Sequence, residues 1–490
     1  MKRPQPSGPR KRRPQPSQPK RLPRRGRPPV QHESARGVAL EALRRADQAG
    51  TFLRDELHRL FERTHLAPRD RALATQLATG AVRHRRTLRL LLGRLRRGQG
   101  RAADIQPALR AVLELGAFQL LFLDRVPDYA AVSEAADAAR GCVGPRRADK
   151  AAGFVNAVLR ALGRLIAGRD RDGRPAPDAI PHPEGGVVRL REAVLADPAN
   201  RAAFLGAAYS YPDWLLARWI AHFGDAQAEA LCRWGNRRPH LVARVNPARP
   251  GAADLLRTLQ ADTPDVCPGP RPGTLDLSAL EPGRLDALLA EAAVTVQDAS
   301  AMAAVEALAP AAGEAILDLC ASPGTKTTQM LEAMGPAARI VACDRTEGKL
   351  EPVRRVLALR GATGAAVCLV DDLAAPPGGF DAALVDAPCS NTGVLARRVE
   401  VRWRLRPADL DELPRIQTVL LARAAALVRP GGRLLYSTCS LEPEENDRVV
   451  QAFLRGRKGW HLRRRDLILP AADHDGAFWA LLEREPGGPR

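Results

Sequence analysis

The fold is decided by residues 315–327, which read AILDLCASPGTKT. An apolar run with the length of a strand, residues 315–319, leads into a turn that contains Pro323 and Gly324. A glycine-bearing turn between a strand and a helix lets a ligand approach the backbone, and a helix N-terminus favours a carboxylate or a phosphate. The sequence therefore predicts a ligand site where this strand ends.

Short apolar strands alternate with helical stretches from about residue 301 onward. The candidate strands are residues 315–319, 339–343, 366–370, 382–385 and 433–436. This alternation is typical of a parallel sheet with crossover helices, and such sheets bind ligands at the carboxyl ends of their strands. We predict an α/β Rossmann-like domain over residues 301–488.

The loop after the first strand discriminates between ligands. A Walker A loop needs Gly immediately before its Lys, but Thr325 precedes Lys326 here, and the spaced glycines of a dinucleotide fold are also missing. S-adenosylmethionine remains as the predicted ligand. The candidate cofactor-binding residues in the loop are Cys320, Ala321, Ser322, Pro323, Gly324, Thr325 and Lys326.

Acidic residues follow the next strands. Asp344 ends the second strand, where an α/β nucleotide fold places the carboxylate that binds the ribose hydroxyls. Asp371, after the third strand, is placed to accept a hydrogen bond from the adenine amino group, although it could be an ordinary surface acid and Asp372 is an adjacent alternative. Asp386 closes the fourth strand and is predicted to line the same site.

Two cysteines lie in short motifs near the ends of the last two strands. Cys389 belongs to DAPCS, residues 386–390, and Cys439 to YSTCS, residues 436–440. Alone, either could be a buried small hydrophobe. Carbon 5 of cytosine is a poor nucleophile, so an enzyme that alkylates it first adds a thiolate at C6, and a second group helps to remove the proton and release the product. The pair therefore indicates methylation of a cytosine ring carbon.

The residues around Cys389 support ring-carbon chemistry. Enzymes that methylate exocyclic amines typically have Asn or Asp followed by Pro-Pro and an aromatic residue there, whereas this chain has Ala387, Pro388 and Cys389. A carboxylate at Asp386 could hydrogen-bond cytosine N3 and N4 and favour attack at C6. Spacing alone does not say which sulfur attacks.

The first part of the chain has a different pattern. Apolar residues recur at helical spacing over residues 35–45, 69–92, 105–123, 130–140 and 150–162. We predict an all-α bundle over residues 33–166, whose arginine-rich faces either bind RNA or are simply solvated. Residues 167–204, rich in Gly, Pro, Asp and Arg, are predicted to be a linker. Residues 205–300 are predicted to form a small α+β module.

Charge and cysteine content limit the class of protein. The formal net charge is +20, and residues 1–32 contain basic residues, prolines and no acidic residue, which predicts a disordered tail. That tail could attract phosphates or only increase solubility. The eight cysteines are scattered without a C-x-x-C pair, which favours a reducing cytoplasm and no structural zinc. No apolar run is long enough to span a bilayer.

Longer motifs carry a family resemblance. Residues 317–327, 386–394 and 436–446 closely resemble the RsmB/Sun family of RNA cytosine-5 methyltransferases, and residues 70–80, 131–135 and 154–160 resemble the RNA-binding NusB family. The resemblance implies an S-adenosylmethionine-dependent enzyme that forms 5-methylcytosine in RNA, with 16S rRNA as the expected substrate. We expect no metal requirement, and a monomer is the default expectation. It also implies that Cys439 attacks C6, that Cys389 assists release, and that Cys320 to Lys326, Asp344, Asp371 and Asp386 line the cofactor site.

The chain departs from that family at three places. Ser322 and Thr325 stand where the family usually has Ala and Gly, and residues 398–403, RVEVRW, differ in a loop expected to contact RNA. Two other functions stay open. One is a cytosine-5 methyltransferase for tRNA or another rRNA, and the other is a non-catalytic RNA-binding scaffold, which would not need to keep both cysteines, Asp344 and Asp386.

Overall fold

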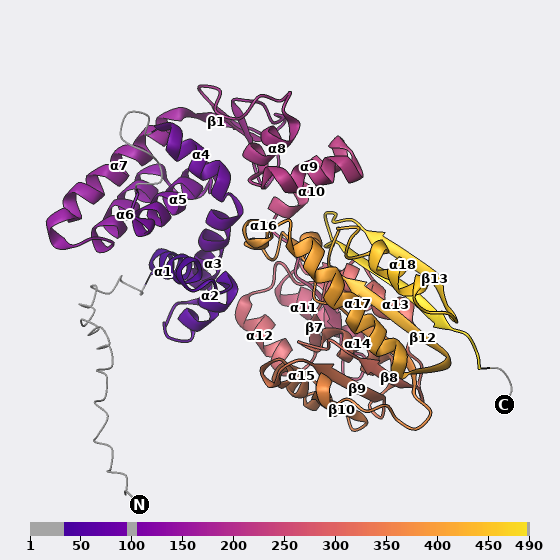
Figure 1. Cartoon of the computed structure of the whole chain (residues 1–490). Helices are drawn as coiled ribbons and strands as arrows, with labels where there is room; N and C mark the ends of the chain where they lie inside the picture. The colour runs from indigo at the N-terminus through magenta and orange to yellow at the C-terminus, as the bar shows by residue number, and fades with distance from the viewer. Residues whose placement is uncertain (1–33, 96–104, 488–490) are drawn as a thin grey trace, which may run out of the picture.

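The structure is a computed structural model of the chain, and it describes residues 34–95 and 105–487. The prediction for residues 1–32 therefore lies outside the described residues. Within them, a helical bundle, two small antiparallel sheets and a seven-stranded sheet follow one another along the chain (Figure 1). No helix in these ranges is long and apolar enough to cross a membrane.

The bundle confirms the predicted all-α fold. Its helices are α1 (Ala35–Ala49), α2 (Leu53–Phe61), α3 (Pro68–Arg83), α4 (Arg85–Leu95), α5 (Pro107–Phe122), α6 (Asp128–Gly141) and α7 (Ala148–Leu165), with a 3-10 turn, η2 (Pro145–Arg147), before α7. The single helix predicted over residues 69–92 is wrong, because it divides into α3 and α4 at His84. The side chains of Thr87 and Ser210 hydrogen-bond across to the neighbouring segment there, which fixes the change of direction.

The prediction of a linker over residues 167–204 is also wrong. This segment contains a three-stranded antiparallel sheet in the order β1-β3-β2, formed by β1 (Ile166–Asp170), β2 (Ala179–Pro181) and β3 (Val187–Leu190). The short apolar runs at Ile180 and Val188 join the same hydrophobic core as the bundle. Each run is too short to give a periodic signal, so the surrounding Gly, Pro and charged residues dominate the sequence pattern.

Three helices and a second small sheet connect this part to the large sheet. The helices are α8 (Arg201–Tyr209), α9 (Asp213–Phe223) and α10 (Asp225–Asn236). The sheet is antiparallel in the order β5-β6-β4-β7, with β4 (Val242–Val245), β5 (Cys267–Pro268), β6 (Thr274–Asp276), β7 (Val294–Val296), η3 (Ala252–Asp254), α11 (Leu255–Asp262) and α12 (Pro282–Ala290). These elements confirm the predicted small α+β module.

The large sheet has the strand order β10-β9-β8-β11-β12-β14-β13. Its strands are β8 (Ala315–Asp318), β9 (Arg339–Asp344), β10 (Ala365–Leu369), β11 (Phe380–Asp386), β12 (Val428–Thr438), β13 (Trp460–Ile468) and β14 (Ala477–Arg484). The first five are parallel and coincide with the five predicted strands, which confirms the Rossmann-like class. The sequence pattern did not predict β13 and β14, which run antiparallel at one edge.

Helices cover both faces of this sheet. One face packs against α13 (Ala299–Leu308), α14 (Thr325–Met334) and α15 (Glu347–Ala358), and the other against α17 (Asp409–Leu427) and α18 (Asp447–Arg455). Short turns η4 (Val370–Asp372) and η5 (Thr392–Val394) follow β10 and β11. Both faces are therefore closed, and the ligand site is left to the carboxyl edge.

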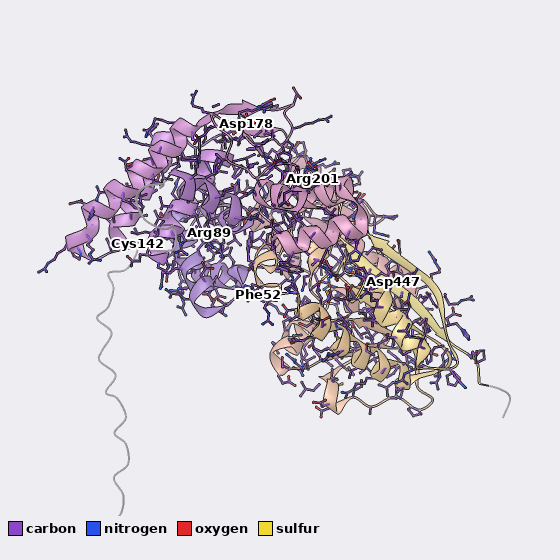
Figure 2. All side chains as sticks on the ribbon, turned by 45° about the horizontal axis from the view of Figure 1, so that its top comes forward. Phe52, Arg89, Cys142, Asp178, Arg201 and Asp447 are labelled. Atoms are coloured by element: carbon purple, nitrogen blue, oxygen red, sulfur yellow. The ribbon has the colours of Figure 1, made fainter. Side chains whose placement is uncertain are left out.

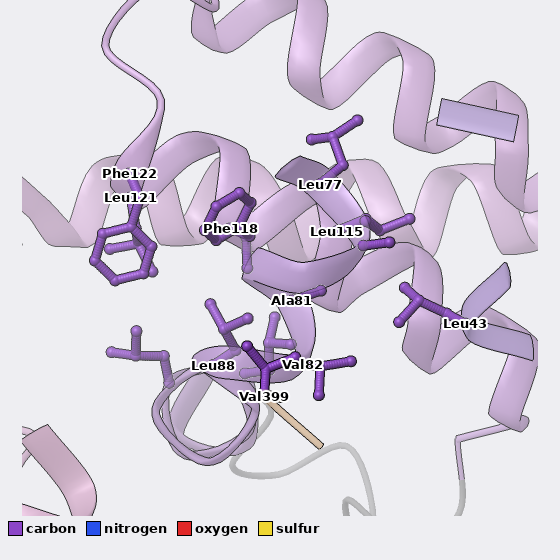
Figure 3. Close-up of a cluster of buried hydrophobic side chains, with 14 of the residues drawn as sticks. Leu43, Leu77, Ala81, Val82, Leu88, Leu115, Phe118, Leu121, Phe122 and Val399 are labelled. Atoms are coloured by element: carbon purple, nitrogen blue, oxygen red, sulfur yellow. The ribbon is translucent and has the colours of Figure 1, made fainter. Parts of the chain in front are cut away.

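The segment around α16 (Val401–Arg404) joins the catalytic domain to the bundle. Val399 is 1% exposed and lies among Leu88, Val82 and other bundle side chains (Figure 3). The Glu400 carboxylate accepts a hydrogen bond from Leu53 N at 2.7 Å, and Arg404 lies over the ring of Phe52. Figure 2 shows Phe52 on the side of the bundle that faces the catalytic domain. Most of the segment expected to contact RNA therefore packs inside the protein instead.

Candidate active site

The carboxyl edge of the large sheet collects three predicted site residues, Asp344, Asp386 and Cys439, together with Asp318, which was not predicted. Asp318 ends β8, Asp344 ends β9, and Asp386 ends β11 directly opposite Ser437 of β12. Cys439 follows β12 immediately. Because these strands are parallel, their ends meet at one edge, as the sequence predicted.

The two cysteine sulfurs are in contact. Cys389 Sγ and Cys439 Sγ lie 3.3 Å apart, and the Cys439 thiol donates to Asn391 Oδ1 at 3.2 Å. The hydrogen bond with Cys439 and burial raise the pKa of Cys389 well above its usual value. Cys389 is therefore a neutral thiol at pH 7. Asn391, which the sequence reasoning did not single out, also donates from Nδ2 to Cys389 O at 2.6 Å and so orients both residues.

Lys326, whose side chain is 13% exposed, supplies positive charge to this edge. Lys326 Nζ lies 2.6 Å from Asp386 Oδ2, and Ser437 Oγ donates to Asp386 Oδ1 at 2.7 Å. Burial opposes the charge of Lys326, but attraction to Asp386 and then to Cys439 outweighs it and raises the pKa of the ammonium. The positive charge of Lys326 therefore lies at the edge that carries Asp386 and Cys439.

The loop between β8 and α14 holds Asp344 at its side. Ser322 N donates to Asp344 Oδ2 at 3.2 Å, and Lys349 Nζ lies 3.0 Å from Asp344 Oδ1. Gly324 has φ +103°, which explains a glycine there, whereas Thr325 already begins α14 and needs no glycine. Burial raises the pKa of the Cys320 thiol in the same loop.

Asp318 is the clearest residue that the sequence reasoning missed. It is 1% exposed, accepts from Thr327 Oγ1 at 2.7 Å through one oxygen, and has no hydrogen-bond partner for the other. Burial raises its pKa to about 7. Its place at the end of a strand, between the loop and Asp344, was the signal that could have identified it. A buried carboxylate oxygen without a partner fits an ammonium group, which S-adenosylmethionine carries together with ribose hydroxyls for Asp344.

The structure does not bring Asp371 into this cluster. Its side chain is 94% exposed and lies 3.4 Å from Arg423 in an ion pair, and Asp372 is exposed as well. A contact from either residue to the adenine amino group stays a prediction.

A buried glutamate ties the two cysteine loops together. Glu445, which is 0% exposed, accepts hydrogen bonds from Ser390 N at 2.8 Å, from Gln417 Nε2 at 2.9 Å, and from the hydroxyls of Ser390 and Ser440. Ser390 follows Cys389 and Ser440 follows Cys439. One carboxylate therefore sets the distance between the two sulfurs.

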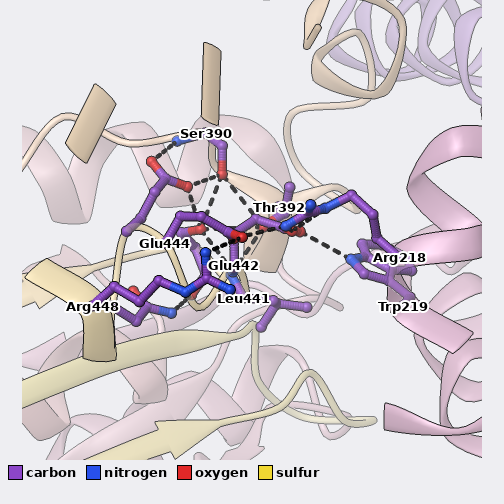
Figure 4. A network of polar contacts seen from close by, with 11 residues as sticks. Arg218, Trp219, Ser390, Thr392, Leu441, Glu442, Glu444 and Arg448 are labelled. Atoms are coloured by element: carbon purple, nitrogen blue, oxygen red, sulfur yellow. Dashed lines mark hydrogen bonds and ion pairs between the residues drawn. The ribbon is translucent and has the colours of Figure 1, made fainter. Parts of the chain in front are cut away.

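The neighbouring Glu442 anchors the same loop to the connecting helices. It is fully buried, pairs with Arg218 at 3.0 Å and accepts from Trp219 Nε1 at 3.0 Å, both on α9 (Figure 4). The loop that carries Cys439 is thus fixed from the catalytic domain and from α9.

Comparison with known proteins agrees with this arrangement. Residues 305–476 match the family described as 16S rRNA methyltransferase RsmB/F, residues 33–164 match the NusB family, and residues 211–274 match the ferredoxin-like domain of RsmF/B-like methyltransferases.

Two similar relatives and one solved structure cover most of the chain. The probable ribosomal RNA small subunit methyltransferase B of Synechocystis is 33% identical, covering 87% of this chain and 90% of the relative. The ribosomal RNA small subunit methyltransferase B of Citrobacter koseri is 32% identical over 87% and 91%. A crystal structure of PH0851 shares the fold with a TM-score of 0.71 at 22% identity, over 94% of this chain and 100% of that one. The chain belongs to the RsmB/F family of S-adenosylmethionine-dependent 16S rRNA methyltransferases.

Proposed function

We propose that this enzyme methylates carbon 5 of a cytosine in 16S rRNA through a covalent adduct between Cys439 and C6 of the base. The observation that carries the proposal is the contact of the two sulfurs, 3.3 Å apart, at the edge that also holds Lys326 and Asp386. Methylation of an exocyclic amine would need neither thiol. The target base has to leave its stack to reach both sulfurs, so an unpaired segment is the expected site.

Cys439 is the nucleophile in this proposal. Lys326 brings a positive charge to the edge where this sulfur lies, and the Asn391 side chain accepts a hydrogen bond from the sulfur and so orients it. Attack forms a bond between sulfur and C6 and moves an electron pair toward C5. The choice of Cys439 rather than Cys389 as the attacking sulfur follows the resemblance of residues 386–394 and 436–446 to the RsmB/Sun family.

The remaining residues hold the reactants. S-adenosylmethionine supplies an electrophilic methyl group when bound, and the loop of residues 320–326, Asp318 and Asp344 would hold it. Asp386, kept in place by Lys326 and Ser437, is positioned to hydrogen-bond N3 or N4 of the base. These contacts fix the ring against the nucleophile.

Release removes the proton from C5 and breaks the bond between C6 and sulfur. The electron pair of the broken C5–H bond restores the C5–C6 double bond, the proton from C5 passes to solvent, and the pair of the C6–S bond returns to Cys439. Cys389 assists this step as a general acid, because its thiol is in contact with the Cys439 sulfur and donates a proton to it as it leaves; the Cys389 thiolate is then reprotonated from solvent. Without it the adduct should persist.

Cysteine variants test the proposal directly. Purified full-length protein is incubated with labelled S-adenosylmethionine and unmodified 16S rRNA, with tRNA as a competing substrate. Cys389→Ala should accumulate an RNA–protein adduct on denaturing gels. Cys439→Ala should form none and should lose methyl transfer by about a thousandfold or more. Bisulfite sequencing of the product locates 5-methylcytosine.

The exposed Cys267 provides the matched control, and Cys267→Ala should behave as the native enzyme. An adduct in Cys439→Ala but not in Cys389→Ala would reverse the two roles. Label in the RNA without any bisulfite-resistant cytosine would overturn carbon 5 as the target. Preferential labelling of tRNA would overturn 16S rRNA as the substrate.

A further inference from the structure

A cleft that is open to solvent lies beside the loop that carries Cys439. Its floor includes Thr392 and Gly393. Gly393 N donates to Cys439 O at 2.9 Å, and Leu441 N donates to Thr392 Oγ1 at 2.9 Å. The cleft is therefore separated from the nucleophile by a single stretch of backbone. A side chain at position 393 would meet Gly476 O at 2.5 Å, so the approach of these loops requires a glycine.

The wall formed by the end of α10 has an aromatic and cationic character. Trp234 is half-buried, and the Arg237 guanidinium lies over its ring, 4.4 Å from the ring centre, in a cation–π contact. Arg238 and His240 continue this wall. Such a surface suits the face of a base and its phosphate rather than an apolar ligand.

The two arginines of this wall lack acidic partners. Throughout the part of the chain that the structure describes, no carboxylate forms an ion pair with Arg237 or Arg238, although many other arginines do pair. The opposite wall shows the contrast, because Arg397 pairs with Asp298 at 2.9 Å and also with the buried Asp475. Asp473, the other acid that lines the cleft, is turned mostly to solvent. Two positive charges are thus left available to a ligand.

We infer that this cleft binds the nucleotide next to the target cytosine on a single-stranded RNA. The base of that nucleotide stacks on the Trp234–Arg237 pair, and its phosphate contacts Arg238. The inference rests on the proposed function, because only a base that leaves its stack beside Cys439 gives its neighbour an unpaired face to bind here. Charge and stacking favour RNA over an acidic peptide, which offers no comparable aromatic face.

Binding measurements without methyl transfer test the cleft. Fluorescence anisotropy measures binding of the full-length protein to a short, labelled single-stranded RNA that contains the target cytosine. The same measurement is made with RNAs in which one flanking nucleotide at a time is abasic. One abasic position should weaken native binding by about five- to a hundredfold. In Trp234→Ala or Arg237→Ala the same abasic substitution should cost little, because its partner is already absent. Arg238→Ala should lower the slope of log K against log salt by about 0.7.

Arg233→Ala is the matched control, since Arg233 lies on the same helix, is exposed and does not line the cleft. Trp234→Phe keeps an aromatic face and should retain binding. Thermal melting of each variant shows whether weaker binding comes from lost stacking or from a folding defect. Equal weakening by Arg233→Ala, or an abasic cost that is the same in Arg237→Ala as in the native protein, would overturn the inference. Two results together would also overturn it. A polyglutamate peptide would displace RNA from the native protein but not from Arg237→Ala, and the abasic RNAs would bind the native protein as tightly as the intact strand.

Failure of the proposed chemistry gives a different result. If no 5-methylcytosine forms but one flanking position still couples to Trp234 and Arg237, RNA binding in the cleft is supported and methylation at carbon 5 is rejected. If 5-methylcytosine forms but no flanking position couples to Trp234 or Arg237, the proposed chemistry is supported and nucleotide binding in the cleft is rejected.

Discussion

Asp318 shows how a single residue of a binding site can lower the folding stability of the protein when no ligand is bound. Its buried, partnerless oxygen keeps the pKa near 7, above its usual 3.8, so the folded protein binds more protons than the unfolded chain between these values. Stability from this group is therefore fully present below about pH 4 and is lost as the pH rises toward 7, by roughly 1.4 kcal/mol per pH unit at most. A ligand ammonium would remove this penalty.

Replacement of that carboxyl should separate stability from binding. Asparagine does not ionise, so Asp318→Asn should not lose stability through this group as the pH rises. The free energy of unfolding of the variant, minus that of the native protein, should therefore be larger at pH 8 than at pH 4. Its affinity for S-adenosylmethionine should fall. Denaturant unfolding without cofactor and calorimetric titration measure the two effects. The exposed Asp372→Asn serves as the control, and an unchanged pH dependence in Asp318→Asn would contradict the argument.

Glu445 controls geometry without being placed to touch the substrate. Its carboxylate accepts four hydrogen bonds, whereas a glutamine amide has only one oxygen to accept them and turns its NH₂ group toward donors. Glu445→Gln should therefore loosen both cysteine loops and lower kcat by about tenfold or more, with the affinity for S-adenosylmethionine unchanged. Single-turnover kinetics and calorimetry test this. Exposed Glu412→Gln is the control, and a loss confined to cofactor affinity would refute the assignment.

Sequence reasoning at this scale succeeded where a motif carries its own chemistry. The cysteines, Lys326 and Asp386 lie in short motifs at strand ends, so the parallel sheet itself brings them together. The roles of Asn391 and Glu445 depend on contacts between loops, which neither spacing nor composition encodes. Asp371 lies after a strand as predicted but is exposed and outside the cluster, so its contact with adenine stays a prediction.

Among the elements, the short helix α16 has an effect out of proportion to its length. Arg402 on this helix is 0% exposed and donates to Asn236 Oδ1 at 2.8 Å and to Gly235 O at 2.9 Å, while its guanidinium lies 4.1 Å from the centre of the Tyr211 ring. It also donates to Leu395 O at 3.2 Å. One side chain therefore joins the catalytic domain to the end of α10.

Arg402→Met should keep the packing volume but leave these buried oxygens without donors. We expect the free energy of unfolding to fall by about 3 kcal/mol, because several acceptors lose their partners together. Denaturant unfolding measures it, and limited proteolysis should show earlier cleavage between the bundle and the catalytic domain. The neighbouring exposed Arg398→Met should change little. Equal stability of the two variants would show that the network is dispensable.

The elements that could be predicted are those with a long periodic signal. The five parallel strands and the long helices of the bundle have one, whereas β1 to β3 are short and lie in a polar context. The antiparallel pair β13 and β14 was missed because β13 is an edge strand with many exposed charged residues, which hides its alternation. The break at His84 is set by contacts with α8, far along the chain.

At the scale of the whole molecule, one hydrophobic core crosses the boundaries predicted from the sequence. It contains Leu43 of the bundle, Val188 of the small sheet, Trp219 of α9 and Val399 of the catalytic domain. A division into independent domains was the natural expectation, because composition changes near residues 167 and 301. Packing ignores those changes, since apolar side chains associate wherever the chain returns.

This continuity matters during synthesis of the protein. The backbone N–H of Leu53 finds its partner, Glu400, and the carbonyl of Val82 finds its partner, Trp403, only after more than three hundred further residues have left the ribosome. At about 5–20 residues per second, that delay is roughly 15–70 s. During this interval the surface of the nascent bundle around Leu53 and Val82 lacks its partner and is accessible to chaperones. The last quarter of the chain then covers it.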